Sequence, residues 1–158
     1  MAWAALEQVL DPEVPVLSVV ELGIVRDVVM DGATVRVTVT PTYSGCPATE
    51  VIQDDIVSAL RAAGANDVRV HMQLAPAWTT DWIAPAAADK LRRYGIAPPH
   101  VAGMPLAEQP LRFHPRDVMC PRCSSTRTEQ LSAFGSTACK ALYRCLDCRE
   151  PFDYFKPI

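Results

Sequence analysis

The sequence predicts an α+β fold, with a small α/β domain followed by a C-terminal module built around four cysteines. Three observations carry this prediction. Alternating residues flank Asp31-Gly32, a helical pattern and a further strand pattern follow them, and two C-x-x-C pairs lie near the C-terminus. The chain of 158 residues is long enough for one modest core and a small appendage.

The hairpin pattern gives the clearest local prediction. Residues 25–30 and 33–40 are expected to form two strands, and in the second of them Val35, Val37 and Val39 alternate with polar residues. Strict alternation around an Asp-Gly turn is the strongest short-range indication of an antiparallel hairpin. Before it, residues 3–10 are expected to form a short helix with Leu6, Val9 and Leu10 on one side. That helix should end before Pro12, which excludes helical backbone at the preceding residue.

A longer helix is expected over residues 48–63, where apolar residues recur at helical spacing and Gly64 follows as the C-terminal cap. Residues 67–73 return to the alternation of a strand. A strand, a helix and a strand in this order predict that the third strand is parallel to one of the hairpin strands. A shorter helix is expected over residues 85–94, followed by Gly95.

Proline content divides the rest of the chain. Five prolines occur between residues 96 and 115, at positions 98, 99, 105, 110 and 115. Proline excludes helix interiors and favours extended backbone, so this segment is expected to be an extended connector. The predicted organisation is therefore a domain over residues 1–95, a connector over 96–115 and a cysteine module over 116–158.

The cysteine module predicts a metal site. Cys120, Cys123, Cys145 and Cys148 form two C-x₂-C pairs, the spacing that presents four sulfurs to one ion. Four thiolates leave no open coordination position, so the metal is expected to be structural, and zinc is the favoured ion. Iron in a rubredoxin-like site or an iron–sulfur cluster remains open, because spacing does not separate the two metals. Residues 126–144 are expected to form two antiparallel strands that turn near Gly135, which makes the module a zinc ribbon.

Composition limits the class of protein. The net charge is −3, and no apolar run approaches the length of about 20 residues that a membrane span needs. The N-terminus lacks the basic and apolar regions of a signal peptide, so we expect a cytoplasmic protein without disulfides and without membrane contact. The module has six basic and four acidic residues between positions 116 and 150. This small excess makes a nucleic-acid-binding zinc ribbon the weaker alternative.

Two further cysteines lie outside the pairs. Cys139 is expected to be a packed thiol, and a fifth ligand or a redox partner is the alternative. Cys46 precedes Pro47 at the expected start of the long helix, where unpaired N–H groups and the helix dipole would favour a thiolate. The alternative for Cys46 is also a thiol that packs in an ordinary turn.

The segments DPEVP at 11–15 and SVVELGIV at 18–25, together with the Cys46-Pro47 turn, resemble the MIP18 (DUF59) family. With the cysteine module, FGSTACK at 134–140 and EPFD at 150–153, the whole chain resembles the PaaD family. PaaD proteins are the D components encoded with the phenylacetyl-CoA epoxidase of aerobic phenylacetate degradation. Cys46 matches the motif cysteine of the first family, and Asp11 and Glu13 match its acidic motif.

The resemblance implies a non-catalytic accessory role in maturing or assembling the epoxidase complex. Its partners would be the oxygenase or reductase components of the epoxidase, and iron–sulfur assembly machinery is a further candidate. Cys46, Asp11 and Glu13 would handle iron or a cluster transiently, although the two acidic residues could equally cap or brace the chain. A stable structural subunit is the first alternative. An enzyme is disfavoured, because the three histidines show no nucleophile–base pattern.

Overall fold

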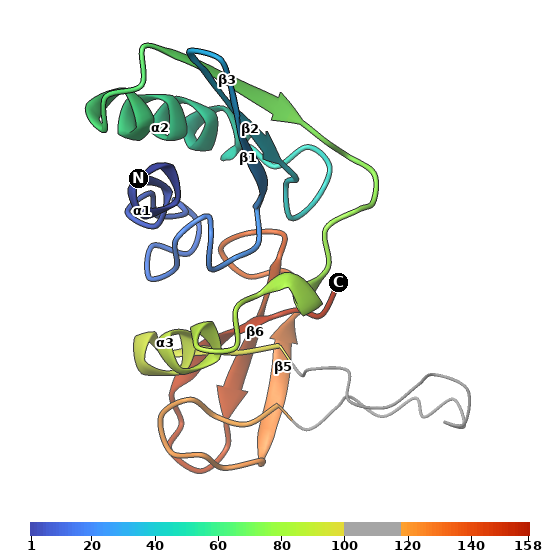
Figure 1. The fold of residues 1–158 in the computed structure, drawn as a ribbon. Coiled ribbons are helices and arrows are strands. Elements are labelled where there is room, and N and C mark those ends of the chain that lie inside the picture. Colours follow the sequence, from blue (N-terminus) through green and yellow to red (C-terminus); the bar gives the residue numbers. More distant parts are fainter. Residues whose placement is uncertain (100–117) are drawn as a thin grey trace. The chain divides into compact units, whose positions relative to one another are not determined.

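The computed structural model describes residues 1–99 and 118–158 (Figure 1). The chain divides into two compact units, Met1–Lys90 and Leu91–Ile158, called here the first and second unit. Each unit contains its own sheet, three-stranded in the first and four-stranded in the second. The predicted α+β fold class is confirmed. Within the described residues, the longest helix is far too short and polar to cross a membrane.

The sheet of the first unit has the strand order β1-β2-β3. β1 (Val25–Asp31) and β2 (Thr34–Val39) are antiparallel, and β3 (Asp67–Met72) is parallel to β2. Both the hairpin and the crossover are therefore as the sequence predicts. α2 (Thr49–Ala62) makes the crossover and contacts β3 (Figure 1). Gly64 follows α2 with a φ of +97°, the left-handed conformation expected of a C-terminal cap.

The core of the first unit forms where the two predicted periodicities meet. The alternating valines of β2 are 0–4% exposed, and Ile52, Ile56 and Leu60 of α2 are equally buried. Leu6 and Leu17 complete this core from the N-terminal segment and are fully buried. Period two on the strand and period 3.6 on the helix thus place apolar side chains in one layer between sheet and helix.

α1 (Ala2–Leu6) is shorter than the predicted helix over residues 3–10. After Glu7 the backbone pairs with a neighbouring loop instead: Val19 N–H donates to Val9 C=O at 2.9 Å, and Asp11 N–H donates to Leu17 C=O at 3.0 Å. These long-range hydrogen bonds replace the helical ones. Leu10, expected on the buried side, is accordingly 49% exposed.

Residues 78–90 pack back onto the loop before β1. The Trp78 indole N–H donates to the Leu22 carbonyl at 2.9 Å, and the Arg26 guanidinium lies 3.5 Å from the centroid of the Trp82 ring. Gly23, with a φ of +69°, lies so close to Trp82 that a Cβ on it would be 2.5 Å from the Trp82 carbonyl oxygen. Glycine is therefore required at position 23 by both backbone conformation and space. Trp82 belongs to the short 3₁₀ helix η1 (Thr80–Trp82).

The sheet of the second unit has the order β4-β7-β6-β5. β5 (Thr128–Ser132) and β6 (Lys140–Cys145) form the predicted antiparallel pair, with Gly135 in their connection. β7 (Pro151–Phe155) was not predicted; it begins on the proline of EPFD and alternates buried Phe152 and Tyr154. Pro151 at the first position leaves the ladder intact.

β4 (Ile96–Ala97) pairs in parallel with β7, so the first two residues of the expected connector belong to a sheet. α3 (Ala87–Tyr94) precedes it and ends at Gly95, as the sequence predicts. Residues 100–115 of the expected connector lie outside the described residues. The predicted domain limits at 95 and 116 stay a prediction.

The core of the second unit contains two of its cysteines. Its buried cluster consists of small and aromatic side chains and these two thiols: Ala97, Val118, Cys120, Ala141, Tyr143, Cys145, Phe152 and Tyr154. Tyr143 stacks on Phe152 and meets Tyr154 edge to face, with ring centroids 5.9 and 5.5 Å apart. Cys120 and Cys145 are therefore part of the hydrophobic core of this small sheet.

Candidate metal and thiol sites

The structure brings the four paired cysteines together. The sulfur atoms of Cys120, Cys123, Cys145 and Cys148 all lie within 4.8 Å of one another, and we call them the four-cysteine cluster. Cys123 Sγ is 3.5 Å from Cys145 Sγ, and Cys120 Sγ is 3.8 Å from Cys148 Sγ. A tetrahedral zinc ion with Zn–S bonds of about 2.3 Å holds its sulfurs about 3.8 Å apart. The donor set and its spacing therefore fit one tetrahedral ion.

Each C-x-x-C pair sits in a turn of the same design. Ser124 N–H donates to the Cys120 carbonyl at 2.9 Å, and Ser124 has a φ of +61°. In the second turn Arg149 occupies the matching position with a φ of +67°. Left-handed backbone at a residue with a side chain costs roughly 1 kcal/mol. In both turns, the free energy that the cysteines would gain by binding a metal ion has to offset this cost. The repeated geometry explains how two short loops present four sulfurs to one point.

Backbone N–H groups donate to the sulfurs. Those of Cys148 and Asp147 donate to Cys145 and lower the pKa of its thiol to about 6, against the opposing effect of burial. The N–H of Glu150 acts likewise on Cys148, but burial and the neighbouring sulfurs raise the pKa of that thiol to about 12. The neighbouring sulfurs thus favour ionisation of Cys145 and oppose that of Cys148, and a divalent cation between the sulfurs would remove that opposition.

Cys139 lies apart from the cluster. It is 2% exposed, and the hydroxyl oxygen of Thr137 is 3.1 Å from its sulfur. The four sulfurs that come together among the described residues do not include this thiol. Its geometry agrees with the packed thiol expected from the sequence.

Cys46 lies in the loop between β2 and α2, but not at the helix start. α2 begins at Thr49 with Ala48 as its N-cap, so the prediction that the helix begins at Pro47 with Cys46 near its N-cap is wrong by two residues. Residues 43–49 form turns instead: Cys46 N–H donates to the Tyr43 carbonyl, and the Cys46 carbonyl accepts from Thr49 N–H at 3.2 Å. The helix dipole therefore acts on Cys46 from further away than expected.

The predicted thiolate character of Cys46 is also wrong for the resting site. Burial raises the pKa of this thiol, and the carboxylates of Glu13 and Asp11 raise it further. The Ala48 N–H and the Tyr43 hydroxyl act in the opposite direction without compensating. Cys46 is thus a protonated thiol at neutral pH, and only a ligand that displaces the proton would convert it to a thiolate.

The two acidic residues of the predicted site take different roles. Asp11 is 4% exposed, and its Oδ1 accepts the N–H groups of Glu13 and Val14, both at 2.8 Å. Asp11 therefore caps the turn it begins, which was one of the expected alternatives. Glu13 Oε1 instead accepts from the Tyr43 hydroxyl at 3.2 Å and lies 3.9 Å from Cys46 Sγ. Asp11, Glu13, Tyr43 and Cys46 are called here the Cys46 site.

Sequence reasoning missed Tyr43. Burial raises the pKa of its phenol well above the ordinary value, with Cys46 and Glu13 adding to the effect, so the hydroxyl stays a donor. Its position three residues before Cys46, in the same loop, was the available indication. The Cys46 thiol also borders two neighbouring hollows that share Pro41, Thr49 and Met72. A small ligand can therefore approach the sulfur from outside.

Comparisons with known proteins agree with this arrangement of two sites. A family model described as "Iron-sulfur cluster assembly protein" matches residues 1–72, and one described as "PaaD zinc beta ribbon domain" matches residues 107–156. The DUF59 domain of Bacillus anthracis has a similar structure, with 31% identity and a TM-score of 0.53 over 57% of this chain and 87% of that chain. The fold and sites therefore define an iron–sulfur assembly (DUF59) domain joined to a zinc β ribbon.

A relative that spans nearly the full chain defines the family. The chain is 53% identical to an Escherichia coli (strain K12) protein named as a subunit of a "Putative 1,2-phenylacetyl-CoA epoxidase", over 99% of this chain and 91% of that protein. It is also 45% identical to the "Fe-S protein maturation auxiliary factor YitW" of Bacillus subtilis (strain 168), over 49% of this chain and 76% of that protein. The chain belongs to the PaaD family.

Proposed function

We propose that this protein is a non-catalytic accessory factor that helps to install or assemble a metal centre of the phenylacetyl-CoA epoxidase complex. The observation that carries the proposal is the Cys46 site within a domain that matches the iron–sulfur cluster assembly family over residues 1–72. The name of the Escherichia coli relative supports the epoxidase as the client. The name of the Bacillus subtilis relative supports maturation as the task.

In this proposal Cys46 binds iron or an iron–sulfur cluster only in passing. A thiol that is protonated at rest binds a metal less tightly at neutral pH, because the metal must displace the proton. The described residues of the first unit offer one thiol and the two carboxylates of Asp11 and Glu13 near it, whereas iron–sulfur clusters are ordinarily held by four thiolates. Weak, incomplete ligation suits a protein that passes its cargo to oxygenase or reductase components, or receives it from iron–sulfur assembly proteins.

The four-cysteine cluster would hold zinc as a structural ion. Its donor set is complete without water, and zinc needs no further ligand in such a site. The bound ion supplies cohesion to the second unit and takes no part in handling iron. A chain with one closed metal site and one transient thiol has no catalytic role in this proposal, and it acts in the cytoplasm beside the enzyme that it serves.

The experiment compares Cys46→Ala with Cys139→Ala in cells that depend on phenylacetate for growth. Cys46→Ala should fold with a normal zinc content, yet its epoxidase complex should be deficient in iron or cluster and growth should be poor. Cys139→Ala removes a thiol from the second unit and should leave iron loading unchanged. Normal iron content and growth with Cys46→Ala would contradict the maturation role.

A structural subunit is the second candidate, and the subunit name of the Escherichia coli relative is the observation that favours it. This candidate predicts fixed stoichiometry with the epoxidase after purification. It also predicts that defective variants lose binding while the metal content of the remaining complex stays normal. Measuring stoichiometry and iron in the same purified sample separates the two functions.

A further inference from the structure

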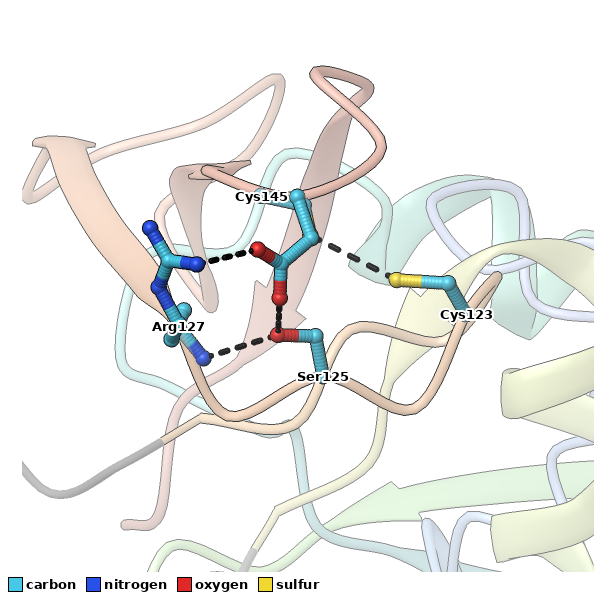
Figure 2. Close-up of polar contacts among 5 residues, drawn as sticks. Cys123, Ser125, Arg127 and Cys145 are labelled. Carbon is cyan, nitrogen blue, oxygen red and sulfur yellow. Dashed lines mark hydrogen bonds and ion pairs between the residues drawn. The ribbon is translucent and has the colours of Figure 1, made fainter.

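A polar network joins the two turns of the four-cysteine cluster from outside. The side chains of Ser125 and Arg127, which follow the first cysteine pair, both bind the carboxylate of Asp147, which lies inside the second pair (Figure 2). Arg127 Nη1 is 2.7 Å from Asp147 Oδ1, and the Ser125 hydroxyl donates to Asp147 Oδ2. Each of the two carboxylate oxygens of Asp147 therefore has a donor from the opposite turn.

The backbone closes this network. Arg127 N–H donates to the Ser125 hydroxyl oxygen at 3.0 Å, and Leu146 N–H donates to the Arg127 carbonyl at 2.8 Å. Ser125 thus accepts one hydrogen bond and gives another, so its orientation is determined. The segments 125–127 and 146–147 are joined at three points, two through the carboxylate and one through the backbone.

The same residues also contact the sulfurs. The backbone N–H of Ser125 donates to Cys123, and the backbone N–H of Asp147 donates to Cys145. Cys123 and Cys145 come from different turns, and their sulfurs are 3.5 Å apart. The side-chain contact between Ser125 and Asp147 therefore fixes the relative position of two N–H donors that serve two sulfurs of the proposed ion.

We propose that Asp147 is a positioning residue for the metal, and that its contacts with Ser125 and Arg127 determine how slowly the ion is released. The proposal rests on the proposed zinc site. Without the carboxylate the two turns are joined near the sulfurs only through the ion, the sheet and the single backbone hydrogen bond from Leu146 to Arg127. The turns then open more often, and an opened turn exposes the ion to competing ligands.

The chain contains a matched control. Glu129 pairs with Arg144 between neighbouring strands of the same sheet, and its side chain is 41% exposed, compared with 40% for Asp147. That ion pair joins β5 to β6 rather than one cysteine turn to the other. Removing Glu129 therefore removes an equally exposed carboxylate, also paired with an arginine, from the same unit while leaving the turns joined.

The test measures zinc release from the purified full-length chain to 4-(2-pyridylazo)resorcinol, a chromogenic chelator. Contacts of this kind around metal ligands are typically worth about 10- to 100-fold in metal affinity. Asp147→Ala should release zinc about 10-fold faster than wild type, and Glu129→Ala should release it at the wild-type rate. Asp147→Asn, which keeps an oxygen acceptor but loses the charge, should give an intermediate rate.

A second measurement separates positioning from general stability. In protein loaded with Co²⁺, the visible d–d bands report the arrangement of the sulfurs, so Asp147→Ala should shift them and Glu129→Ala should not. Equal release rates and equal spectra for the Asp147→Ala and Glu129→Ala variants would overturn the positioning role. Wild-type protein purified without any metal would overturn the zinc site and this inference together, whereas metal-bound wild type with an unaffected Asp147→Ala would overturn the inference alone.

Discussion

The two units of this chain use cysteine in opposite ways. In the first unit the core is aliphatic, with Leu6, Leu17 and Ile56 fully buried, and the single thiol Cys46 stands at the edge of that core beside an acidic side chain. In the second unit Cys120 and Cys145 belong to the core itself. We therefore expect the first unit to fold without its cysteine, which would leave that thiol available for the proposed transient chemistry. We expect the second unit to need its cysteines for cohesion, which would make them unavailable for such chemistry.

The largest test of this contrast removes the cluster ligands. The double variant Cys120→Ser, Cys148→Ser should lose its zinc and unfold the second unit, because structural zinc contributes on the order of 10 kcal/mol in small modules. The first unit should stay folded. Elemental analysis gives the zinc content, and amide hydrogen exchange gives the protection of each unit. Zinc content equal to that of wild type, or loss of protection in both units, would contradict the proposed difference between the two units.

The second test destabilises the first unit by a substitution that leaves its thiol unchanged. Gly23→Ala places a methyl group 2.5 Å from the Trp82 carbonyl oxygen at a residue with positive φ, and overpacking together with backbone strain should destabilise the first unit by about 3 kcal/mol. Gly64→Ala is the matched control, because its φ is also positive but the space around it is open. It should cost only about 1 kcal/mol. Urea denaturation of the two variants measures the difference, and equal losses would show that Trp82 does not press on position 23.

A smaller effect is expected in the first cysteine turn. Ser124→Gly removes the strain of a φ of +61°, so the metal-bound second unit should become more stable by about 0.5 to 1 kcal/mol. Ser132→Gly, at the end of β5, is the control, and it should be destabilising because glycine weakens a strand. Thermal unfolding of the zinc-loaded chain gives both shifts. A lower melting temperature for Ser124→Gly would mean that the serine side chain holds the turn.

The smallest expected effect is a pH dependence in the first unit. Burial by itself raises the pKa of Glu21, but Lys90, 2.6 Å away, and Ser18 together hold it below the ordinary value of 4.5. A carboxyl whose pKa is lowered by folding stabilises the folded state above pH 4.5, and this contribution is lost as the pH falls through the folded pKa. With Lys90 half exposed, the pair is worth at most about 1 kcal/mol.

Glu21→Gln should therefore lower the free energy of unfolding slightly at pH 7 and have less effect when the pH is well below 4.5. The control is Asp31→Asn, which breaks a pair with Arg36 whose side chains are 50% and 70% exposed. That change should alter stability little at either pH. A cost of Glu21→Gln that is the same at both pH values would show that the Lys90 ion pair does not stabilise the fold.

Local patterns predicted the elements whose stability is decided locally. The valines of β2, the apolar face of α2 and the hairpin at Gly32 were readable because period and turn chemistry agree with the final burial. The shortened α1 and the unpredicted β7 have another cause. Val9 and Asp11 pair with a loop, and β7 forms between two partner strands, so both depend on segments that sequence periodicity does not bring together.

The candidate sites divide in the same way. The spacing of the cluster cysteines was sufficient to predict that their sulfurs meet. The chemistry of Cys46 could not be predicted, because its pKa depends on burial and on Glu13, which is 33 positions away in the chain. Tyr43 was missed for the same reason, since its role appears only when the loop folds over Glu13.

The tryptophans of this chain provide an optical consequence. All three, Trp3, Trp78 and Trp82, lie in the first unit, and the 68 residues from Leu91 to Ile158 contain tyrosine but no tryptophan. Intrinsic fluorescence excited near 295 nm therefore reports on the first unit alone, without any label. Trp78, 3% exposed, should shift its emission to the red as that unit unfolds. If tryptophan emission stays constant while zinc is removed, the first unit has remained folded as the second unit lost its metal. The two units can then be followed separately in a single cuvette.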